Sequence, residues 1–444
     1  MRSSLARRAA VFGSAALLLL GPATAVAQAQ PAESPAVAES GVSDQAAHLP
    51  IELIDALQRD LQLTPDQYLQ RSALAQKLAE FAEIARIQFP DAFAGAWIDP
   101  SGAPVVGLAH AGRGDARAAV EQAGFTAKDV ERSQSQLEST RSALSDWIGT
   151  LPPEIAKFVR GVTVDIANND VVLRADDTAG DVLDLLPPEL REAARVALGP
   201  ALASLQPAAP GQATAQYAAD AFLGGDPYVA NGGGMGLKCS LGFNAIDGGG
   251  APVNISAGHC DPNRTFAGTE HASQAYAAVG DLSGPMIGTF ERTSLDGSDY
   301  SIIRPAAGTA QRFANNGVRV PNAAPVAITG TADPVVGAPV CKAGNTSGFN
   351  CGVVTAVHQT VPVGQRVIND GFATNLCALQ GDSGGPIVTG TLALGISSAS
   401  NVGDYGMCEI ANFATSAMGE APELFATPIN AILGQNPGLR IRTS

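Results

Sequence analysis

The segment "CALQGDSGGPIVTG", residues 377–390, holds one serine between an acidic residue and two glycines. Glycine, aspartate and serine are common in turns, so the cluster is consistent with a simple turn. A serine nucleophile has such neighbours for a different reason. It needs an exposed hydroxyl, backbone N–H groups that can bind a developing oxyanion, and no side chains that crowd the substrate. Ser383 is therefore a candidate nucleophile if the chain also supplies a base and a carboxylate.

Histidine is the usual base for such a serine. Three histidines, His259, His271 and His358, lie in the same half of the chain as Ser383. His259 follows an apolar run in "NISAGHC" and precedes Cys260, where a disulfide can fix its backbone. His271 and His358 stand in ordinary polar segments, which favours positions at the surface or at the edge of a core. We therefore expect His259 to be the base.

A histidine base needs a buried carboxylate that orients its ring. The segment "LDGSDYSIIRP" offers two candidates, Asp296 and Asp299. Asp296 precedes Gly297, and Asp-Gly is typical of turns. Asp299 opens the strand-like run 300–303, which can carry it into the interior. The alternative for Asp299 is a cap at the start of that strand, and we expect the catalytic role.

The order His259, Asp299, Ser383 is that of the chymotrypsin-type triad. The segments "SAGHC", "SDYSII" and "GDSGGP" resemble the triad motifs of the chymotrypsin-fold serine peptidases. More narrowly, "KCSLGFNA", "VCKAGNTSGFNCGVVTA" and "CALQGDSGGPIVTGTLALGISS" resemble segments of the bacterial α-lytic protease and streptogrisin group. The preceding half of the chain is similar to the pro-region of that group.

The resemblance implies an all-β mature part of two antiparallel six-stranded barrels with a C-terminal helix, preceded by an α+β pro-region. The active site would lie in the cleft between the barrels. Ser383 would attack the peptide carbonyl, His259 would accept and return its proton, and Asp299 would orient His259. The N–H groups of Gly381 and Ser383 would form the oxyanion hole. The resemblance implies no cofactor.

The resemblance also implies a structural ion pair and three disulfides. Asp382 is expected to be buried behind the oxyanion loop, and a buried charge needs a partner. In this bacterial group a basic residue after the third cysteine supplies it, which predicts a Lys342–Asp382 pair. The six cysteines alone allow 15 pairings. The pairs implied by the resemblance are Cys239–Cys260, Cys341–Cys351 and Cys377–Cys408.

The specificity pocket is expected to be uncharged. Cys377 occupies the position at which trypsin-like enzymes carry an aspartate, so no charge awaits a lysine or arginine of the substrate. The group typically has two glycines where Ala399 and Ser400 stand, which suggests a narrower pocket. We expect cleavage after apolar, uncharged residues. The residues expected to bind substrate are Ala378, Leu379 and Gln380 on one wall and Ser398, Ala399 and Ser400, which would pair with the substrate backbone, on the other.

Composition and charge limit the partners of these 444 residues. The net charge of −15 argues against nucleic acid or an anionic membrane surface as a partner. The six cysteines show no spacing typical of zinc ligands, and an even number of cysteines in an exported chain predicts disulfides. No metal site is expected. The expected partners are polypeptide substrates and the chain's own pro-region, with a monomeric mature enzyme.

The N-terminus predicts export. Arg2, Arg7 and Arg8 precede an apolar stretch over residues 9–20, and Ala25–Ala27 supplies a small-x-small cleavage site. Whether the export route is Sec or Tat stays open. No other apolar run approaches the roughly 18 residues of a membrane span. We therefore expect a secreted protein.

We predict that the chain divides into five segments, of which the last carries the candidate site. They are a signal peptide (1–27), a flexible lead-in (28–48), the α+β pro-region (49–205), a linker and processing region (206–224) and the protease domain (225–444). In the pro-region we predict a helix with Thr64 as N-cap and an apolar stripe through Leu78 and Ile84. We also predict hairpins that turn near residues 100–102 and 168–169, each followed by a helical stretch, one before Trp147 and one around 189–198. In the protease domain only residues 421–433 indicate a helix.

The pro-region is interpreted as an intramolecular folding catalyst and inhibitor, cut away near residues 222–225. A substrate-binding domain or a spacer is the alternative for that region. For the whole chain, the alternative is an exported peptidase-like binding module without catalysis. An esterase of another fold is disfavoured, because it would show G-x-S-x-G and the order Ser, Asp, His.

Overall fold

The computed structural model describes residues 45–110, 113–176, 184–199, 220–279, 282–363, 366–417 and 420–444. The predicted signal peptide, most of the predicted lead-in and residues 206–219 of the predicted linker lie outside these ranges. Within the described ranges, none of the helices combines the length and apolarity needed to cross a membrane.

The N-terminal α+β segment comprises the described residues between 45 and 199. Its strands are β1 (Phe93–Ile98), β2 (Pro104–Leu108), β3 (Thr126–Asp129), β4 (Val159–Asp165), β5 (Asp170–Asp176) and β6 (Arg195–Gly199). Its helices are α2 (Ile51–Ala56), the π-helical turn η1 (Leu57–Leu61), α3 (Pro65–Gln88), α4 (Arg113–Gln122), α5 (Gln134–Thr150), α6 (Pro153–Ala156) and α8 (Pro188–Ala193). The strands follow the orders β1-β2-β3 and β4-β5-β6.

The predicted start of α3 is confirmed. The Thr64 side chain accepts from the Gln67 N–H and the Gln67 side chain accepts from the Thr64 N–H, which forms a capping box with Pro65 at the first turn. The predicted apolar stripe is only partly buried. Leu78 is fully buried, whereas Ile84 is 55% exposed. The buried face of α3 instead runs through Tyr68, Leu69, Ser72, Ala75, Leu78 and Ala85, and its small and polar members weaken the hydropathy pattern.

Both predicted hairpins are present. β1 and β2 pair across a turn at residues 99–103, and β4 and β5 pair across a turn in which Asn169 has a φ of 55°. The helical stretch predicted before Trp147 is part of α5. The prediction of a helix over 189–198 was half wrong, because β6 replaces its second half and pairs in parallel with β5.

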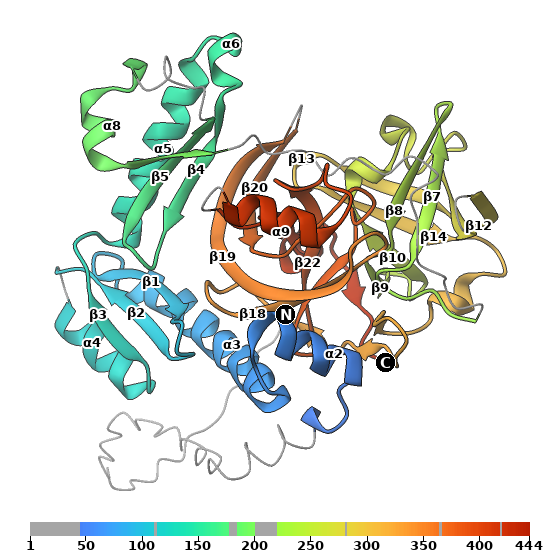
Figure 1. The fold of residues 1–444 in the computed structure, drawn as a ribbon, viewed down its shortest axis with the longest axis horizontal. Coiled ribbons are helices and arrows are strands. Elements are labelled where there is room, and N and C mark those ends of the chain that lie inside the picture. Colours follow the sequence, from blue (N-terminus) through green and yellow to red (C-terminus); the bar gives the residue numbers. More distant parts are fainter. Residues whose placement is uncertain are drawn as a thin grey trace, which may run out of the picture. The chain divides into compact units, whose positions relative to one another are not determined.

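An eight-stranded antiparallel sheet forms the first half of the β region (Figure 1). Its strand order is β24 (Arg440–Ile441), β9 (Phe243–Ile246), β10 (Pro252–Ser256), β14 (Tyr300–Pro305), β12 (Leu282–Ser294), β11 (Gln274–Val279), β7 (Pro227–Gly232) and β8 (Met235–Ser240). The central six strands run from β9 to β7, and the short β24 and the hairpin strand β8 extend the two edges.

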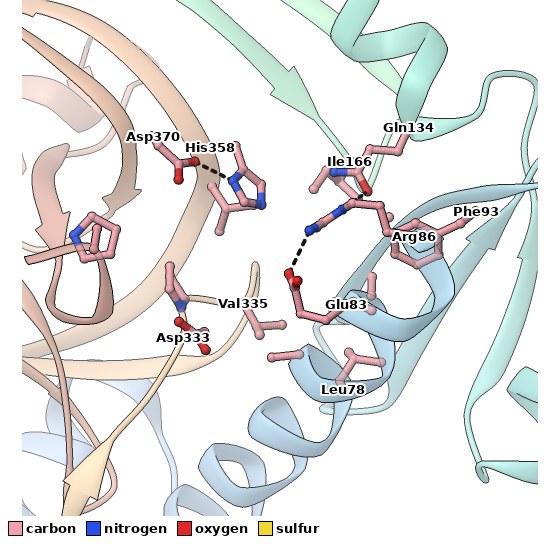
Figure 2. Close-up of a pocket in the computed structure, with 18 residues that line it drawn as sticks. Leu78, Glu83, Arg86, Phe93, Gln134, Ile166, Asp333, Val335, His358 and Asp370 are labelled. Atoms are coloured by element: carbon pink, nitrogen blue, oxygen red, sulfur yellow. Dashed lines mark hydrogen bonds and ion pairs between the residues drawn. The ribbon is translucent and has the colours of Figure 1, made fainter. Parts of the chain in front are cut away.

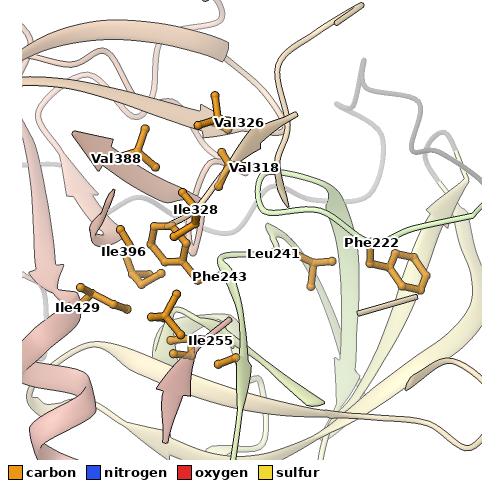
Figure 3. Packing of buried hydrophobic residues seen from close by; sticks show 14 of the residues in the cluster. Phe222, Leu241, Phe243, Ile255, Val318, Val326, Ile328, Val388, Ile396 and Ile429 are labelled. Carbon is orange, nitrogen blue, oxygen red and sulfur yellow. The ribbon is translucent and has the colours of Figure 1, made fainter. Parts of the chain in front are cut away.

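Six strands of the second half close into a ring, so this sheet is a complete antiparallel barrel. Around the ring they are β18 (Pro339–Gly344), β19 (Gly348–Val363), β20 (Arg366–Thr374), β23 (Leu424–Pro428), β22 (Leu392–Ser400) and β21 (Pro386–Thr389), which pairs back with β18. The strand β19 also pairs with β4 of the N-terminal α+β segment through Thr360 and Val162. One apolar cluster spans the two sheets, and in it Phe243 and Ile255 of the first sheet lie near Ile396 of the second (Figure 3). A second cluster joins the second barrel to the N-terminal α+β segment.

Short elements complete the β region. They are β13 (Asp296–Gly297), β15 (Gly317–Val318), β16 (Val326–Ala327), β17 (Gly330–Thr331), the 3₁₀ turns η2 (Gly258–Cys260), η3 (Arg264–Phe266) and η4 (Ala310–Phe313), and the helices α9 (Cys408–Ala417) and α10 (Ile429–Gln435).

The predicted helix over residues 421–433 was wrong in its first half. Residues 424–428 form β23, which pairs with β20 and β22 and closes the barrel. Leu424 and Phe425 are buried there, and the helix α10 starts only after Pro428. Barrel closure provides hydrogen bonds and burial on both sides of this segment, which outweighs its helical propensity. The sequence analysis also missed α9.

Residues 222–224, assigned to the linker from the sequence, pack as part of the β region. Phe222 is 1% exposed, and its N–H donates to the Arg312 carbonyl at 2.8 Å. Its ring lies 4.8 Å from that of Phe313 between centroids. The next residues are held as well, since Asp226 forms an ion pair with Arg319. Burial raises the pKa of Asp226, and the Arg319 guanidinium opposes that rise.

Replacement of Phe222 should therefore destabilise the β region. We expect Phe222→Ala to lower the free energy of unfolding by about 3–5 kcal/mol, because it leaves a cavity between Phe313 and the barrel core. Urea unfolding of the full chain carrying Ser383→Ala measures this without self-cleavage. Phe266→Ala is the control, since Phe266 is 43% exposed. Equal stability of the two variants would contradict the assignment of residue 222 to the folded domain.

Candidate active site

The register of two neighbouring strands brings the predicted base and carboxylate together. β10 and β14 are antiparallel, with Ser256 opposite Ser301. The chain leaves β10 into the turn η2, which carries His259, and enters β14 directly after Asp299. Two residues that are 40 positions apart in the sequence thus meet at one end of the strand pair.

Asp299 holds His259 through both its ring and its backbone. The ring Nδ1 lies 2.7 Å from Asp299 Oδ2, and the His259 N–H donates to Asp299 Oδ1 at 2.9 Å. The two side chains are 6% and 1% exposed. Because the carboxylate accepts at Nδ1, Nδ1 carries the proton and Nε2 is the basic nitrogen. The pair therefore has the tautomer that a general base requires.

Ser398 adds a contact that the sequence did not suggest. Its Oγ donates to Asp299 Oδ2, which already accepts from the His259 ring. The expected pairing of Ser398 with substrate involves its backbone, and its hydroxyl has a separate role in stabilising the carboxylate. No local signal indicates this contact, since 99 residues separate the partners. A bulge in β22 between residues 397 and 399 accompanies it.

Ser383 lies beside the turn that carries His259. Its carbonyl oxygen is 3.8 Å from Cys260 Sγ and accepts from the Ser240 N–H at 2.8 Å. The adjacent Gly384 N–H donates to the Ser397 carbonyl at 3.0 Å. An exposed hydroxyl was expected for Ser383, but the residue is 0% exposed. Its loop is packed against β8, the His259 turn and β22, which explains the burial.

The glycines around Ser383 are required by backbone angle and by space. Gly381 and Gly384 have φ values of 96° and 82°, which favour glycine. A β-carbon on Gly384 would collide with Ser256 Oγ and lie 2.6 Å from the Ser240 carbonyl oxygen. The glycine pattern that marked the motif therefore lets the loop press against the first barrel.

A buried ionic cluster around Asp382 stabilises this loop. Lys342 Nζ lies 3.1 Å from Asp382 Oδ2, and both side chains are 0% exposed. Oδ1 accepts from the Thr346 and Ser347 N–H groups at 2.8 and 3.0 Å. Oδ2 also accepts from the Leu379 N–H at 2.9 Å and from Ser347 Oγ at 2.5 Å. The charge is fully paired and hydrogen-bonded, as a buried carboxylate requires.

Three disulfides frame the site. Cys239–Cys260 fixes the His259 turn, Cys341–Cys351 joins β18 to β19, and Cys377–Cys408 ties the nucleophile segment to α9. These are the pairs that the resemblance implies. Chain-entropy arguments assign about 2–4 kcal/mol to each such link.

The residues of the expected pocket walls are buried or hydrogen-bonded to neighbouring segments. Ala378 and Leu379 are buried, and the Gln380 N–H and side chain are fixed to Gly403 and Asp404. On the opposite wall Ala399 packs in a cluster with Phe425, and Ser400 Oγ accepts from the Val402 N–H. The strand β22 pairs with β21 from Leu392 to Ile396, so its residues 398–400 lie beyond that pairing.

The other two histidines of the β region lie elsewhere. The side chain of His271 is 68% exposed beside Glu270, and His358 pairs with Asp370 on the β19–β20 hairpin. In the described part of the chain, no group of three or more His, Cys, Asp or Glu side chains is arranged to hold a metal ion.

Comparisons with known proteins place this chain among bacterial serine peptidases. No family model matches the chain. Streptogrisin-C of Streptomyces griseus is 30% identical over 447 residues, which cover 100% of this chain and 86% of that protein. Serine protease 2 of Streptomyces fradiae is 39% identical over 178 residues, which cover 40% of this chain and 93% of that protein. The structure of a Nocardiopsis protease has 30% identity and a TM-score of 0.38, and the match covers 50% of this chain and 99% of that one.

The protein is a serine-type endopeptidase with the chymotrypsin fold. Within that class, the chain belongs to the streptogrisin family of bacterial serine peptidases.

Loss of the Lys342 charge should disable the nucleophile loop. In Lys342→Ala the buried Asp382 carboxylate loses its counter-ion, which costs about 3–5 kcal/mol. We expect activity on a peptide substrate to fall at least 100-fold, measured per folded molecule. Lys342→Arg is the control, because it keeps the charge and should retain most activity. Retained activity in Lys342→Ala would show that the pair is dispensable.

Proposed function

We propose that His259, Asp299 and Ser383 are the catalytic triad of a secreted endopeptidase that cleaves after apolar, uncharged residues and is made as a proenzyme. The observation that carries the proposal is the double contact of Asp299 with the ring and backbone of His259, beside the loop of Ser383. A binding module would need no carboxylate that fixes a histidine tautomer.

The chemistry follows from the geometry. Asp299 holds the Nδ1 proton, so Nε2 of His259 accepts the Ser383 proton as Oγ attacks the peptide carbonyl. The resulting imidazolium is stabilised by the Asp299 carboxylate and returns the proton to the leaving amine. The N–H groups of Gly381 and Ser383 bind the oxyanion. Water then hydrolyses the acyl-enzyme by the same steps in reverse order.

The pocket residues support a preference for apolar side chains. Ala378, Leu379 and Ala399 are uncharged and buried, and Cys377 is engaged in a disulfide. One structural relative is described as a glutamic acid specific serine protease that uses a histidine triad in substrate binding. The walls proposed here contain no histidine, which argues against that preference for this chain.

A covalent probe tests the triad. We expect a phosphonofluoridate to label the mature enzyme at Ser383, and Ser383→Ala to abolish both labelling and cleavage. Asp299→Asn should lower kcat about 10⁴-fold, because it favours the wrong His259 tautomer. His271→Ala is the control and should keep full activity. Cleavage that persists in Ser383→Ala would exclude this nucleophile, and a peptide library would define the preferred residue before the scissile bond.

The proenzyme proposal is supported by contacts between the N-terminal α+β segment and the second barrel. Asp60 of η1 accepts from the Cys351 N–H at 2.9 Å, and Thr389 Oγ1 donates to Ser72 Oγ at 3.0 Å. The Ile98 N–H donates to the Val336 carbonyl at 2.8 Å. Together with the β4–β19 pairing, these contacts fall on β19, β21 and the segment just before β18.

Charged groups face one another across a cavity of about 230 Å³ in this interface. Figure 2 shows the His358–Asp370 pair of the barrel on one side and the Arg86–Glu83 pair of α3 on the other. The hydrogen bond with His358 lowers the pKa of Asp370, and Arg86 and Arg141 act in the same direction although burial opposes them. Asp370 therefore stays ionised and attracts both arginines.

The need for kinetic stability explains why a protease would require a segment that assists folding. A secreted protease survives its own activity by unfolding slowly, and a high barrier to unfolding is also a barrier to folding. A segment that organises β18 and β19 lowers the folding barrier and is then removed. Because residues 222–224 pack in the core, we propose that processing occurs before Phe222 and not within residues 222–225.

Refolding tests the foldase role. Residues 220–444 alone should refold to active enzyme at least 100-fold more slowly than when residues 45–199 are added. Asp60→Ala in the added segment should weaken this rescue, because it removes the acceptor for Cys351 N–H. Asp55→Ala, at an exposed position of α2, is the control. Rapid refolding without the added segment would refute the role.

A further inference from the structure

Ser240, the last residue of β8, uses each of its polar groups at the boundary between the two barrels. Its Oγ donates to the Gly381 carbonyl at 2.9 Å and accepts from the Asn345 N–H at 2.9 Å. Its N–H donates to the Ser383 carbonyl at 2.8 Å, and its own carbonyl accepts from Ser256 Oγ at 3.0 Å. The side chain is 0% exposed.

Two of these contacts fall on the residues whose N–H groups are proposed to bind the oxyanion. Ser240 holds the carbonyl of Gly381 through its hydroxyl and the carbonyl of Ser383 through its backbone. The Gly381 carbonyl belongs to the peptide plane that joins Gly381 to Asp382, so fixing it restricts ψ of Gly381 and leaves fewer orientations for the Gly381 N–H. This restraint matters for Gly381, because glycine has more accessible backbone conformations than any other residue. The observed φ of 96° is one of several that it could adopt.

We propose that Ser240 is a positioning residue of the oxyanion hole, which keeps the Gly381 N–H directed at the substrate carbonyl. The inference rests on the proposed triad and extends it to a residue of the first barrel. The bond from Asn345 N–H to Ser240 Oγ leaves the hydroxyl proton for Gly381, so the direction of the donated bond is fixed. The lysine–aspartate cluster supports the loop from one side and Ser240 from the other.

Through Ser240, the first barrel also contributes to the geometry of the proposed oxyanion hole. Ser240 follows Cys239, whose disulfide fixes Cys260 next to His259. The same short segment thus connects the turn of the base and the loop of the nucleophile. Preorganised donors contribute most when they do not reorganise during the reaction.

Ser240→Ala in the full chain, after maturation, tests the proposal. It removes the hydroxyl and keeps the backbone bond to Ser383. We expect kcat per active site to fall about 10- to 100-fold with KM within about twofold, less than the 10²–10³-fold loss of an oxyanion donor itself. The affinity for a peptide boronate, which mimics the tetrahedral intermediate, should fall by a similar factor. Active sites are counted by titration with a phosphonofluoridate.

Further variants separate positioning from general stability. Ser240→Thr keeps the hydroxyl and should keep kcat per site within about threefold of the parent. Thr309→Val is the matched control, because Thr309 Oγ1 also donates to a backbone carbonyl in the first barrel. Unchanged kcat per site in Ser240→Ala, or an equal loss in Ser240→Thr, overturns the proposal. If the parent enzyme is not labelled at Ser383, the triad fails instead.

Discussion

The Asp299 carboxylate is the contact on which the site depends. It accepts from the ring and backbone of His259 in the first barrel and from Ser398 in the second. Buried charge of this kind is costly unless every acceptor position is used. Two of these contacts form within the first barrel, and the third, from Ser398, forms only when the second barrel is docked. The carboxylate is therefore fully hydrogen-bonded only when both barrels are in place.

The loop that carries Ser383 is likewise held at two places by buried groups whose hydrogen bonds are satisfied. Asp382 is held by Lys342 and by three backbone N–H groups, and Ser240 holds the carbonyls of the loop from the first barrel. These contacts use fixed dipoles and buried charge where water is excluded, and so they preorganise the loop before substrate binds. The glycines of the motif are needed because this packing leaves no room for side chains.

The N-terminal α+β segment attaches to the second barrel. The second barrel closes only when β23, late in the chain, pairs with β20 and β22, and such long-range pairing makes folding slow. β4 pairs with the edge of β19, and η1 contacts the backbone beside the Cys341–Cys351 disulfide. The proposed foldase role requires a partner at such a position.

Local sequence determined the features that depend on neighbouring residues. The capping box of Thr64, the two N-terminal hairpins and the candidates His259, Asp299 and Ser383 could all be identified from short motifs. Tertiary structure alone decided which contacts those residues make. β23 is a strand because two barrel neighbours pair with it. Ser398 and Ser240 reach partners 99 and 141 residues away, and Ile84 faces solvent because of what packs on the rest of α3. These outcomes are set by burial and pairing between distant segments, which local propensities do not encode.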